Sequence, residues 1–397
     1  MNSLVIIVTL FLTVYGIFHL YLLIKARKAF YLEGLGYFLL FTVLVFLLIA
    51  PINAHILERQ GHSILALLMA WVGNLWMGMI FIFVWLSLPL DAYHLFMVLM
   101  QRLSNGDLTH LMLSRRQRFV LSALLTLVIL GYGAYEAQNL QVNAITLRSP
   151  KLPADRQRIR VVQISDLHLG PMMFQARVKP IVEAVAAAKP DILVSTGDLL
   201  DGRIPDMVEI QQMLNAVKAP MGKFAVTGNH EYYAGLDLAA TFTKAAGFTL
   251  LQNKSVVLDN GLAVVGVDDP AGGALDSSIE QTLLSGLPPG KFTLLLKHRP
   301  RAAPQSSALF DLQLSGHTHH GQMLPLGLLV RLRYPLDHGL LTFPEGSRIY
   351  TSSGAGTWGP PFRLMARPEI TVIDLLPGAA VEQKTTGTNP ASTGRKK

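Results

Sequence analysis

The sequence contains no cysteine, and charged residues make up only 15% of its 397 residues. The absence of cysteine excludes disulfide bonds, thiolate metal sites and cysteine nucleophiles. Any metal ion must therefore be held by nitrogen and oxygen ligands. The chain also lacks an aromatic-basic platform and a recognition helix, so we expect no nucleic-acid partner despite the formal net charge of +8.

Acidic residues are scarce in the first 138 residues, and long apolar runs fill this part of the chain. The runs cover residues 4–24, 35–53, 64–90 and 119–135. Each is near the ~20 residues that a helix needs to cross the hydrocarbon of a bilayer. We therefore expect residues 1–138 to form a transmembrane helical domain of about four spans. Residues 92–100 are expected to form a separate interfacial helix.

Basic residues gather after the first apolar run and before the fourth. They are Lys25, Arg27, Lys28, Arg102, Arg115, Arg116 and Arg118. Cytoplasmic loops carry such an excess of Lys and Arg. Four spans would then place everything after Tyr135 outside the membrane, in the periplasm or an equivalent space. More bases follow at residues 148–158, and a three- or five-span arrangement would invert this orientation.

From Arg158 onwards, apolar runs of strand length alternate with segments of helical periodicity. A helix is expected where apolar residues recur through residues 178–185. The expected strands cover residues 158–164, 192–196, 223–227, 255–259, 262–267, 292–297, 311–315, 348–352 and 369–374. An Asp259-Asn260-Gly261 turn should join two of them as a hairpin.

This alternation predicts an α/β fold, a mixed sandwich of sheets with helices outside. We expect residues 139–154 to be a linker and residues 155–376 to be the catalytic domain. Residues 377–397 are rich in Gly, Thr, Ser and Lys, which is typical of a disordered tail.

Polar clusters directly follow five of the expected strands: SDLH, GDLLD, GNHE, KH and GHTHH. Residues just past the carboxyl ends of strands in an α/β sheet project into one crevice, so these segments should meet. Seven nitrogen or oxygen ligands are too many for one transition-metal ion. They suit two ions that share one carboxylate. The seven are Asp166, His168, Asp198, Asn229, His298, His317 and His319.

The ordered motifs D-x-H, G-D, G-N-H, H and G-H-x-H resemble those of the calcineurin-like metallophosphoesterase superfamily, across about residues 155–376. The strings GNHEYY, KHRP, GHTHHGQ and SSGAGTWGPPFRLMARPEI look like its membrane-associated bacterial phosphodiesterase branch. That branch includes periplasmic or cell-wall phosphodiesterases and proteins that cleave the pyrophosphate of UDP-2,3-diacylglucosamine. His320 stands where a glycine is usual in this pattern.

The resemblance implies a metallophosphoesterase-type β-sandwich and a role for each motif residue. One ion would be bound by Asp166, His168 and His319. The second would be bound by Asn229, His298 and His317, with Asp198 bridging the two. His230 would protonate the leaving group or stabilise charge in the transition state, a role that imidazole suits near neutrality.

Other polar residues have weaker assignments. Arg299, Arg363 and His320 are expected substrate contacts, because a guanidinium can pair with two phosphate oxygens and His320 lies at the rim. Acidic residues in turns are expected to be caps or satisfied turn residues; they are Asp201, Glu231, Asp268 and Asp269. The mixed ligands suit Mn²⁺ first, with Fe or Zn²⁺ as alternatives.

The sequence therefore predicts a membrane-anchored, dinuclear-metal phosphohydrolase that cleaves a phosphodiester or pyrophosphate bond, with a lipid-linked substrate favoured. We expect a multi-pass protein of a bacterial inner membrane whose catalytic domain is extracytoplasmic. The alternatives are a UDP-2,3-diacylglucosamine pyrophosphatase, which requires access to the cytoplasmic side, and a non-catalytic membrane receptor that retains the fold. The sequence indicates no oligomeric state.

Overall fold

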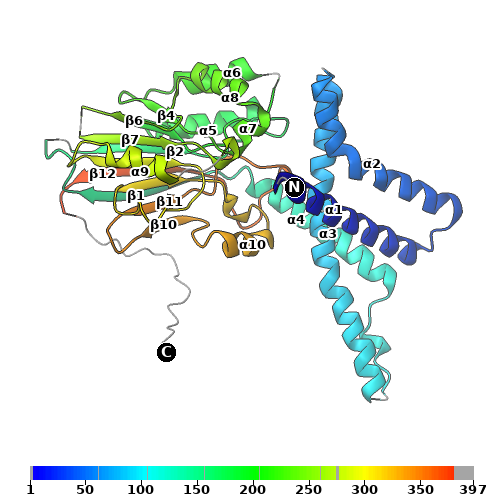
Figure 1. Cartoon of the computed structure of the whole chain (residues 1–397). Coiled ribbons are helices and arrows are strands. Elements are labelled where there is room, and N and C mark those ends of the chain that lie inside the picture. The colour runs from blue at the N-terminus through cyan, green and yellow to red at the C-terminus, as the bar shows by residue number, and fades with distance from the viewer. Residues whose placement is uncertain are drawn as a thin grey trace.

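The computed structural model describes residues 3–379, apart from residues 61, 105, 156, 205, 260 and 274–276. The chain begins with four long helices: α1 (Ser3–Phe30), α2 (Gly34–Arg59), α3 (Ser63–Ser104) and α4 (Arg115–Glu136). Each supplies a segment long and apolar enough to cross a membrane, so the expected count of four is confirmed. Figure 1 shows them together on one side of the α/β part of the chain.

Helix α3 is longer than the sequence predicted. It runs for 42 residues, or about 63 Å at the usual rise per residue, and includes the stretch expected as a separate interfacial helix. Pro89 lies inside it without ending it. A proline removes one backbone hydrogen bond, and the leucines and methionines that follow favour helix strongly enough for the helix to continue.

The remaining chain forms two mixed sheets of six strands each. The first sheet has the order β1-β12-β2-β3-β4-β5 and the second β10-β11-β9-β8-β7-β6. The strands are β1 (Gln141–Ser149), β2 (Ile159–Ile164), β3 (Ile192–Ser195), β4 (Lys223–Ala225), β5 (Thr249–Leu250), β6 (Lys254–Val257), β7 (Leu262–Val267), β8 (Phe292–Lys297), β9 (Leu312–Ser315), β10 (Gly339–Thr342), β11 (Arg348–Thr351) and β12 (Glu369–Pro377).

The two sheets pack face to face, with helices on the outside. Side chains from both sheets, such as Val161 and Leu294, share one buried cluster between them. The helices are α5 (Gln175–Ala187), α6 (Met207–Ala216), α7 (Asn229–Ala234), α8 (Leu236–Ala245), α9 (Ser277–Ser285) and α10 (Leu326–Arg333), with short 3₁₀ turns at η1 (Thr109–Leu111), η2 (Pro270–Gly272) and η3 (His319–Gly321). The predicted α/β sandwich flanked by helices is confirmed.

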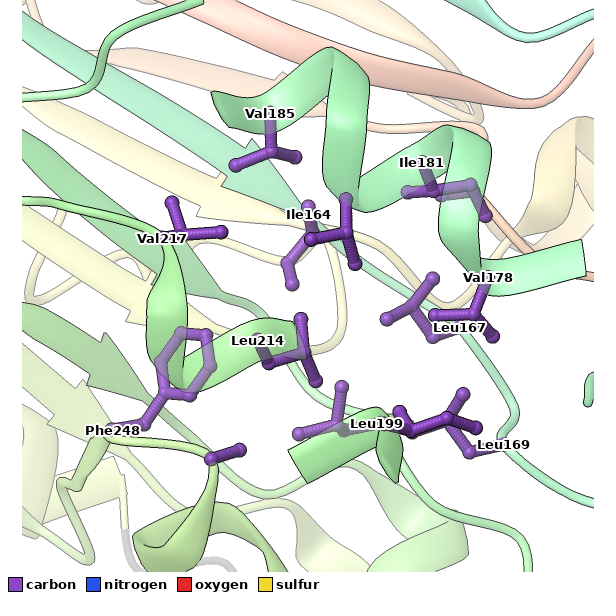
Figure 2. Packing of buried hydrophobic residues seen from close by; sticks show 14 of the residues in the cluster. Ile164, Leu167, Leu169, Val178, Ile181, Val185, Leu199, Leu214, Val217 and Phe248 are labelled. Carbon is purple, nitrogen blue, oxygen red and sulfur yellow. The ribbon is translucent and has the colours of Figure 1, made fainter. Parts of the chain in front are cut away.

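Helix α5 shows how the outer layer is attached. Its apolar face, including Val178, Ile181 and Val185, packs on Ile164 of β2 and Leu214 of α6 (Figure 2). The spacing that predicted this helix is therefore the spacing of its buried face.

Strand β1 lies within the stretch expected to be a linker. It pairs in parallel with β12, from Gln141 opposite Glu369 to Ser149 opposite Pro377. Polar and apolar residues mix along β1, because an edge strand needs only one covered face. The strand therefore lacks the apolar run that predicted the buried strands. We propose that the catalytic domain begins with β1. The expected tail from residue 380 onwards and the turn residue Asn260 lie outside the described residues.

The helices touch the α/β domain at several places, including Met172 and Phe174 against α2 and α3, and a late loop makes hydrogen bonds to α4. The amide of Arg363 donates to the Gly133 carbonyl of α4 at 3.0 Å. The Glu136 carboxylate, at the end of α4, accepts from the amides of Met365 and Ala366, each at 3.1 Å. Phe362 packs with apolar side chains of α3 and α4. The loop that meets the helices is therefore held by specific hydrogen bonds as well as by apolar contact.

Candidate metal centre

The five polar motifs converge because their strands run in parallel. In the first sheet β2, β3 and β4 are parallel neighbours, and in the second β8 and β9 are. The motifs follow the carboxyl ends of these strands, so they meet at one edge of the sandwich. The structure thus brings together His168 and His319, which lie 151 residues apart.

One cluster contains Asp166, His168 and His319, all buried. The Nε2 atoms of His168 and His319 lie 2.9 Å apart. His319 Nε2 lies 3.3 Å from Asp166 Oδ1. Three ligand atoms therefore face one small volume, as a bound cation requires.

A second cluster contains Asp198, His298 and His317. His298 Nε2 lies 3.1 Å from Asp198 Oδ2 and 3.2 Å from His317 Nδ1. The same Asp198 Oδ2 lies 3.8 Å from Nε2 of His168 in the first cluster. Asp198 is therefore placed to face both clusters.

Asn229 follows Gly228, whose backbone packs against Asp198 of the second cluster. The side-chain oxygen of Asn229 is buried and has no hydrogen-bond partner among the described residues. A buried amide oxygen without a partner is costly. A cation in the second cluster would satisfy it, so the residues present fit a metal centre.

The second ring nitrogen of three proposed ligand histidines contacts a fixed oxygen atom. Nδ1 of His168 lies 2.7 Å from Asp201 Oδ1, and Nδ1 of His298 donates to the Thr196 carbonyl at 2.8 Å. Nε2 of His317 lies 3.1 Å from the Tyr334 hydroxyl. In metal sites the second nitrogen of a ligand histidine usually donates to such an oxygen, which sets the tautomer and turns the free nitrogen to the metal.

Burial sets the protonation of the G-H-x-H histidines. It lowers the pKa of His317 and His319 well below the usual range. Both imidazoles are therefore neutral at physiological pH, the state that can coordinate a metal. Burial opposes ionisation of Asp198 too, but the charge and hydrogen bond of His298 outweigh it, and the pKa of Asp198 lies well below its ordinary value.

The backbone at the ligands is strained. Asp166, His168, Asp198, His317 and His319 all have φ between 49° and 72°, the left-handed region that residues other than glycine rarely adopt. Such conformations cost of order 1–3 kcal/mol each and gather at functional sites. The fold therefore holds these side chains in place against a local preference.

Two glycines of the motifs are needed for close approach. A Cβ at Gly316 would collide with the Asp166 carboxylate and the Ser165 hydroxyl. A Cβ at Gly228 would collide with the Asp198 carboxylate. The absence of a side chain at both positions allows the loops to pack directly on the carboxylates.

His230 lies at the open side of the two clusters. Its Nδ1 is 3.0 Å from Asp201 Oδ1, and its amide donates to Asp198 Oδ1 at 2.9 Å. Burial alone would lower the pKa of His230, but the carboxylates of Asp201 and Asp198 raise it to about 9. The indole of Trp358, 54% exposed, lies 6.1 Å from its ring. His230 is therefore a partly accessible, protonated imidazole beside the ligand set.

Three predicted substrate contacts have different surroundings. Both Nε and Nη2 of Arg299 bind the Asp269 carboxylate, at 2.8 and 2.9 Å. His320 Nδ1 lies 2.8 Å from Asp337 Oδ2. Arg363 is fully buried, and its guanidinium donates to the carbonyls of Ser353, Gly354, Gly356 and Ala366. The Arg363 guanidinium therefore has no face open to a substrate from solvent.

Two acidic residues expected to be caps or turn residues also support the ligands, although Glu231 does cap α7 as expected. Asp201 joins His168 to His230, and the isolated bridge between Leu169 and Leu200 brings it there. The Glu231 carboxylate accepts from the amides of Gly228 and Leu199, each at 2.7 Å, and so ties two ligand loops together. The only sequence signal was their position inside the motifs GDLLD and GNHE.

Comparison with known proteins agrees with this geometry. Residues 159–321 match the family model described as calcineurin-like phosphoesterase. An uncharacterized metallophosphoesterase of Aquifex aeolicus is 39% identical over 253 residues, which is 62% of this chain and 97% of that protein. An uncharacterized metallophosphoesterase of Campylobacter jejuni is 33% identical over 65% of this chain and 69% of its own length. A Danio rerio transmembrane protein with metallophosphoesterase domain is 32% identical, covering 64% of this chain and 62% of that protein.

Proposed function

Because the chain belongs to the calcineurin-like phosphoesterase family and is a metal-dependent phosphoesterase, we propose that it is a membrane-anchored phosphohydrolase with two metal ions. Its substrate is a phosphodiester or pyrophosphate, with a lipid-linked molecule favoured. The observation that carries this proposal is the pair of ligand clusters, with Asp198 of the second cluster also 3.8 Å from His168 Nε2 of the first.

The proposed ligands divide between two ions. Asp166, His168 and His319 hold one ion, and Asn229, His298 and His317 hold the other. Asp198 bridges them. Two divalent ions in such a site supply electrostatic stabilisation of the phosphoryl oxygens and lower the pKa of coordinated water. Mn²⁺ is the first choice for assay, with Fe and Zn²⁺ next, because the ligands are mixed carboxylate, amide and imidazole.

His230 is the proposed catalytic acid. Asp201 holds its Nδ1, which leaves Nε2 free to donate a proton to the leaving oxygen. The raised pKa of His230 keeps that proton in place at neutral pH in the metal-free chain.

The arginines receive separate roles. We assign Arg363 to positioning, because its guanidinium ties together the carbonyls of the loop that packs on Asp166. Arg299 and His320 stay proposed rim contacts for the substrate. Both lie on carboxylates, Asp269 and Asp337, that hold the side chains in fixed positions.

Four long apolar helices and transmembrane relatives identify a membrane protein. The placement in a bacterial inner membrane, with the catalytic domain on the extracytoplasmic side, rests on the distribution of basic residues. A reporter fused after Lys397 that is active only outside the cytoplasm would support this side. A reporter active only inside would reverse it and favour a UDP-2,3-diacylglucosamine pyrophosphatase.

Hydrolysis by the purified full-length protein tests the assignment. With Mn²⁺ it should cleave bis(p-nitrophenyl) phosphate, and Asp198→Ala and His319→Ala should abolish turnover. Asp155→Asn, at an exposed carboxylate, is the matched control and should retain it. Unchanged turnover in the Asp198 and His319 variants would refute the site, and a well-folded, metal-loaded protein that is inactive on all phosphodiesters would favour the receptor alternative.

A further inference from the structure

Helix α10 carries an apolar face that nothing in the described chain covers. Leu328 and Leu329 are each 58% exposed, and Leu332 is 83% exposed. A water-soluble surface scatters such side chains singly, whereas a contiguous exposed patch indicates a binding surface.

The leucines form one face with arginines on both sides. Leu328 and Leu332 are one turn apart, and Leu329 adjoins them on the helical surface. At 100° per residue, Arg331 falls on one flank of this leucine face and Arg333 on the other. Both arginines are exposed, although Arg331 also contacts Asp337 at 3.1 Å. Apolar residues between flanking cations are typical of helices that lie in a membrane interface.

The opposite side of α10 is firmly seated on the domain. Gly327 is buried, and a Cβ at Gly321 would collide with its backbone, so the start of the helix packs directly on the motif loop. Tyr334, at the end of the helix, places its hydroxyl 3.1 Å from Nε2 of His317. The leucine face is therefore presented outward by a helix fixed to the metal centre.

The segment that leads into α10 packs against the transmembrane helices. Met323, three residues before α10, packs with Ile82 of α3, Leu130 of α4 and Phe362. Figure 1 shows α10 on the side of the domain nearest α4. A bilayer that surrounds α3 and α4 would therefore lie close to α10.

We propose that α10 inserts its leucine face into the surface of the phospholipid bilayer that holds α1 to α4, with Arg331 and Arg333 against anionic headgroup phosphates. Long basic side chains reach the headgroups while their stems cover apolar surface. This contact fixes the metal centre at the bilayer surface. The proposal rests on exposure, position and charge, and does not depend on the reaction that the centre catalyses.

The absence of cysteine allows a direct test in the full-length protein. Leu332→Cys, labelled with an environment-sensitive nitrobenzoxadiazole dye, is reconstituted in vesicles of phosphatidylcholine and phosphatidylglycerol. We expect blue-shifted emission that lipids with a doxyl group near the headgroup quench. Val257→Cys is the matched control, because Val257 is 44% exposed on β6 at the far side of the domain. Its dye should emit as in water and escape doxyl quenching.

Equal emission from the two labelled positions, with no doxyl quenching at residue 332, would overturn the proposal. Disulfide-linked dimers of Leu332→Cys without doxyl quenching would assign the face to a second copy and also overturn it. The arginines are tested in Leu332→Cys with Arg331→Gln and Arg333→Gln added. Quenching in this variant should fall and lose its dependence on phosphatidylglycerol, whereas an unchanged dependence would exclude headgroup contact by these arginines.

Discussion

The four N-terminal helices and the α/β domain both bury apolar residues, but only the helices expose many large ones and only the domain buries a dense polar site. In the helices, large apolar side chains face outward, as Leu35 and Val128 do at 73% and 69% exposure. In the domain, Asp166 and His298 are completely buried while apolar residues fill the two interior layers. Lipid solvates apolar side chains, so membrane helices can expose them at no cost. Polar groups buried in the domain need specific partners that satisfy their hydrogen bonds or charges. Buried polar side chains therefore mark the metal centre, and exposed large apolar side chains mark the surface that faces lipid.

Among residues that are not proposed metal ligands, the largest expected effect lies where the domain buries most polarity. His230→Ala removes the proposed proton donor and should lower kcat by about 10²–10⁴-fold, with metal content unchanged, because His230 is not a proposed ligand. Steady-state hydrolysis of bis(p-nitrophenyl) phosphate measures this. His110→Ala removes an exposed histidine on η1 and should have no effect. Full activity without His230 would assign the proton transfer elsewhere.

The junction between the two regions should be sensitive to one carboxylate. Glu136→Ala leaves the amides of Met365 and Ala366 without their acceptor, at a cost of about 1–3 kcal/mol for the buried Ala366 and less for the exposed Met365. We expect a lower free energy of unfolding for the domain in detergent. Glu136→Gln retains one acceptor oxygen and should lose less. Equal stability of the Ala variant and the parent would show that the helices and the domain are not coupled through this loop.

A smaller effect is expected behind the metal ligands. Asp201→Asn removes the carboxylate that orients His168 and should weaken metal binding by about 10–100-fold. Metal titration of the metal-free protein measures the affinity independently of turnover, with Asp155→Asn as the control. If the affinity does not change, Asp201 acts on His230 alone.

The smallest effect is expected at a partly exposed ion pair between the neighbouring strands β2 and β12. There the Arg160 guanidinium binds the Asp374 carboxylate through two hydrogen bonds of 2.8 and 2.9 Å, which lowers the pKa of Asp374. A lowered pKa in the folded state stabilises the protein above the unfolded value of about 3.9, and this contribution is lost as pH falls through the folded pKa. Asp374→Asn should therefore cost up to about 1 kcal/mol at pH 7 and nothing at the acidic end. Unfolding measured across pH 2–7 checks the sign, and a pH-independent difference would contradict it.

The sequence was sufficient for most of the fold because its patterns are local. Apolar runs of membrane length identify α1 to α4, and strand-length runs identify all strands that are buried on both faces. It did not indicate β1, β5 or β10, because these edge strands are incompletely buried, or the single length of α3, which continues past the apolar run at 64–90. The ligand motifs were visible because their residue types, order and adjacent glycines occur together after strands.

Residues that support the site could not be read from the sequence. Asp201 reaches His168 only through pairing between two loops, and Tyr334 reaches His317 only because α10 folds back over the motif. The burial of Arg363 depends on carbonyls of a loop whose path is set by α4. These relations depend on tertiary structure, which neither spacing nor residue type encodes.

Anomalous diffraction from crystals of the Mn²⁺-loaded full-length protein tests the central claim most directly. We predict two anomalous peaks roughly 3.5–4 Å apart, with the Asp198 carboxylate between them and the histidines divided between the two peaks. A single peak, or peaks away from these seven side chains, would contradict a dinuclear centre at this edge of the sandwich.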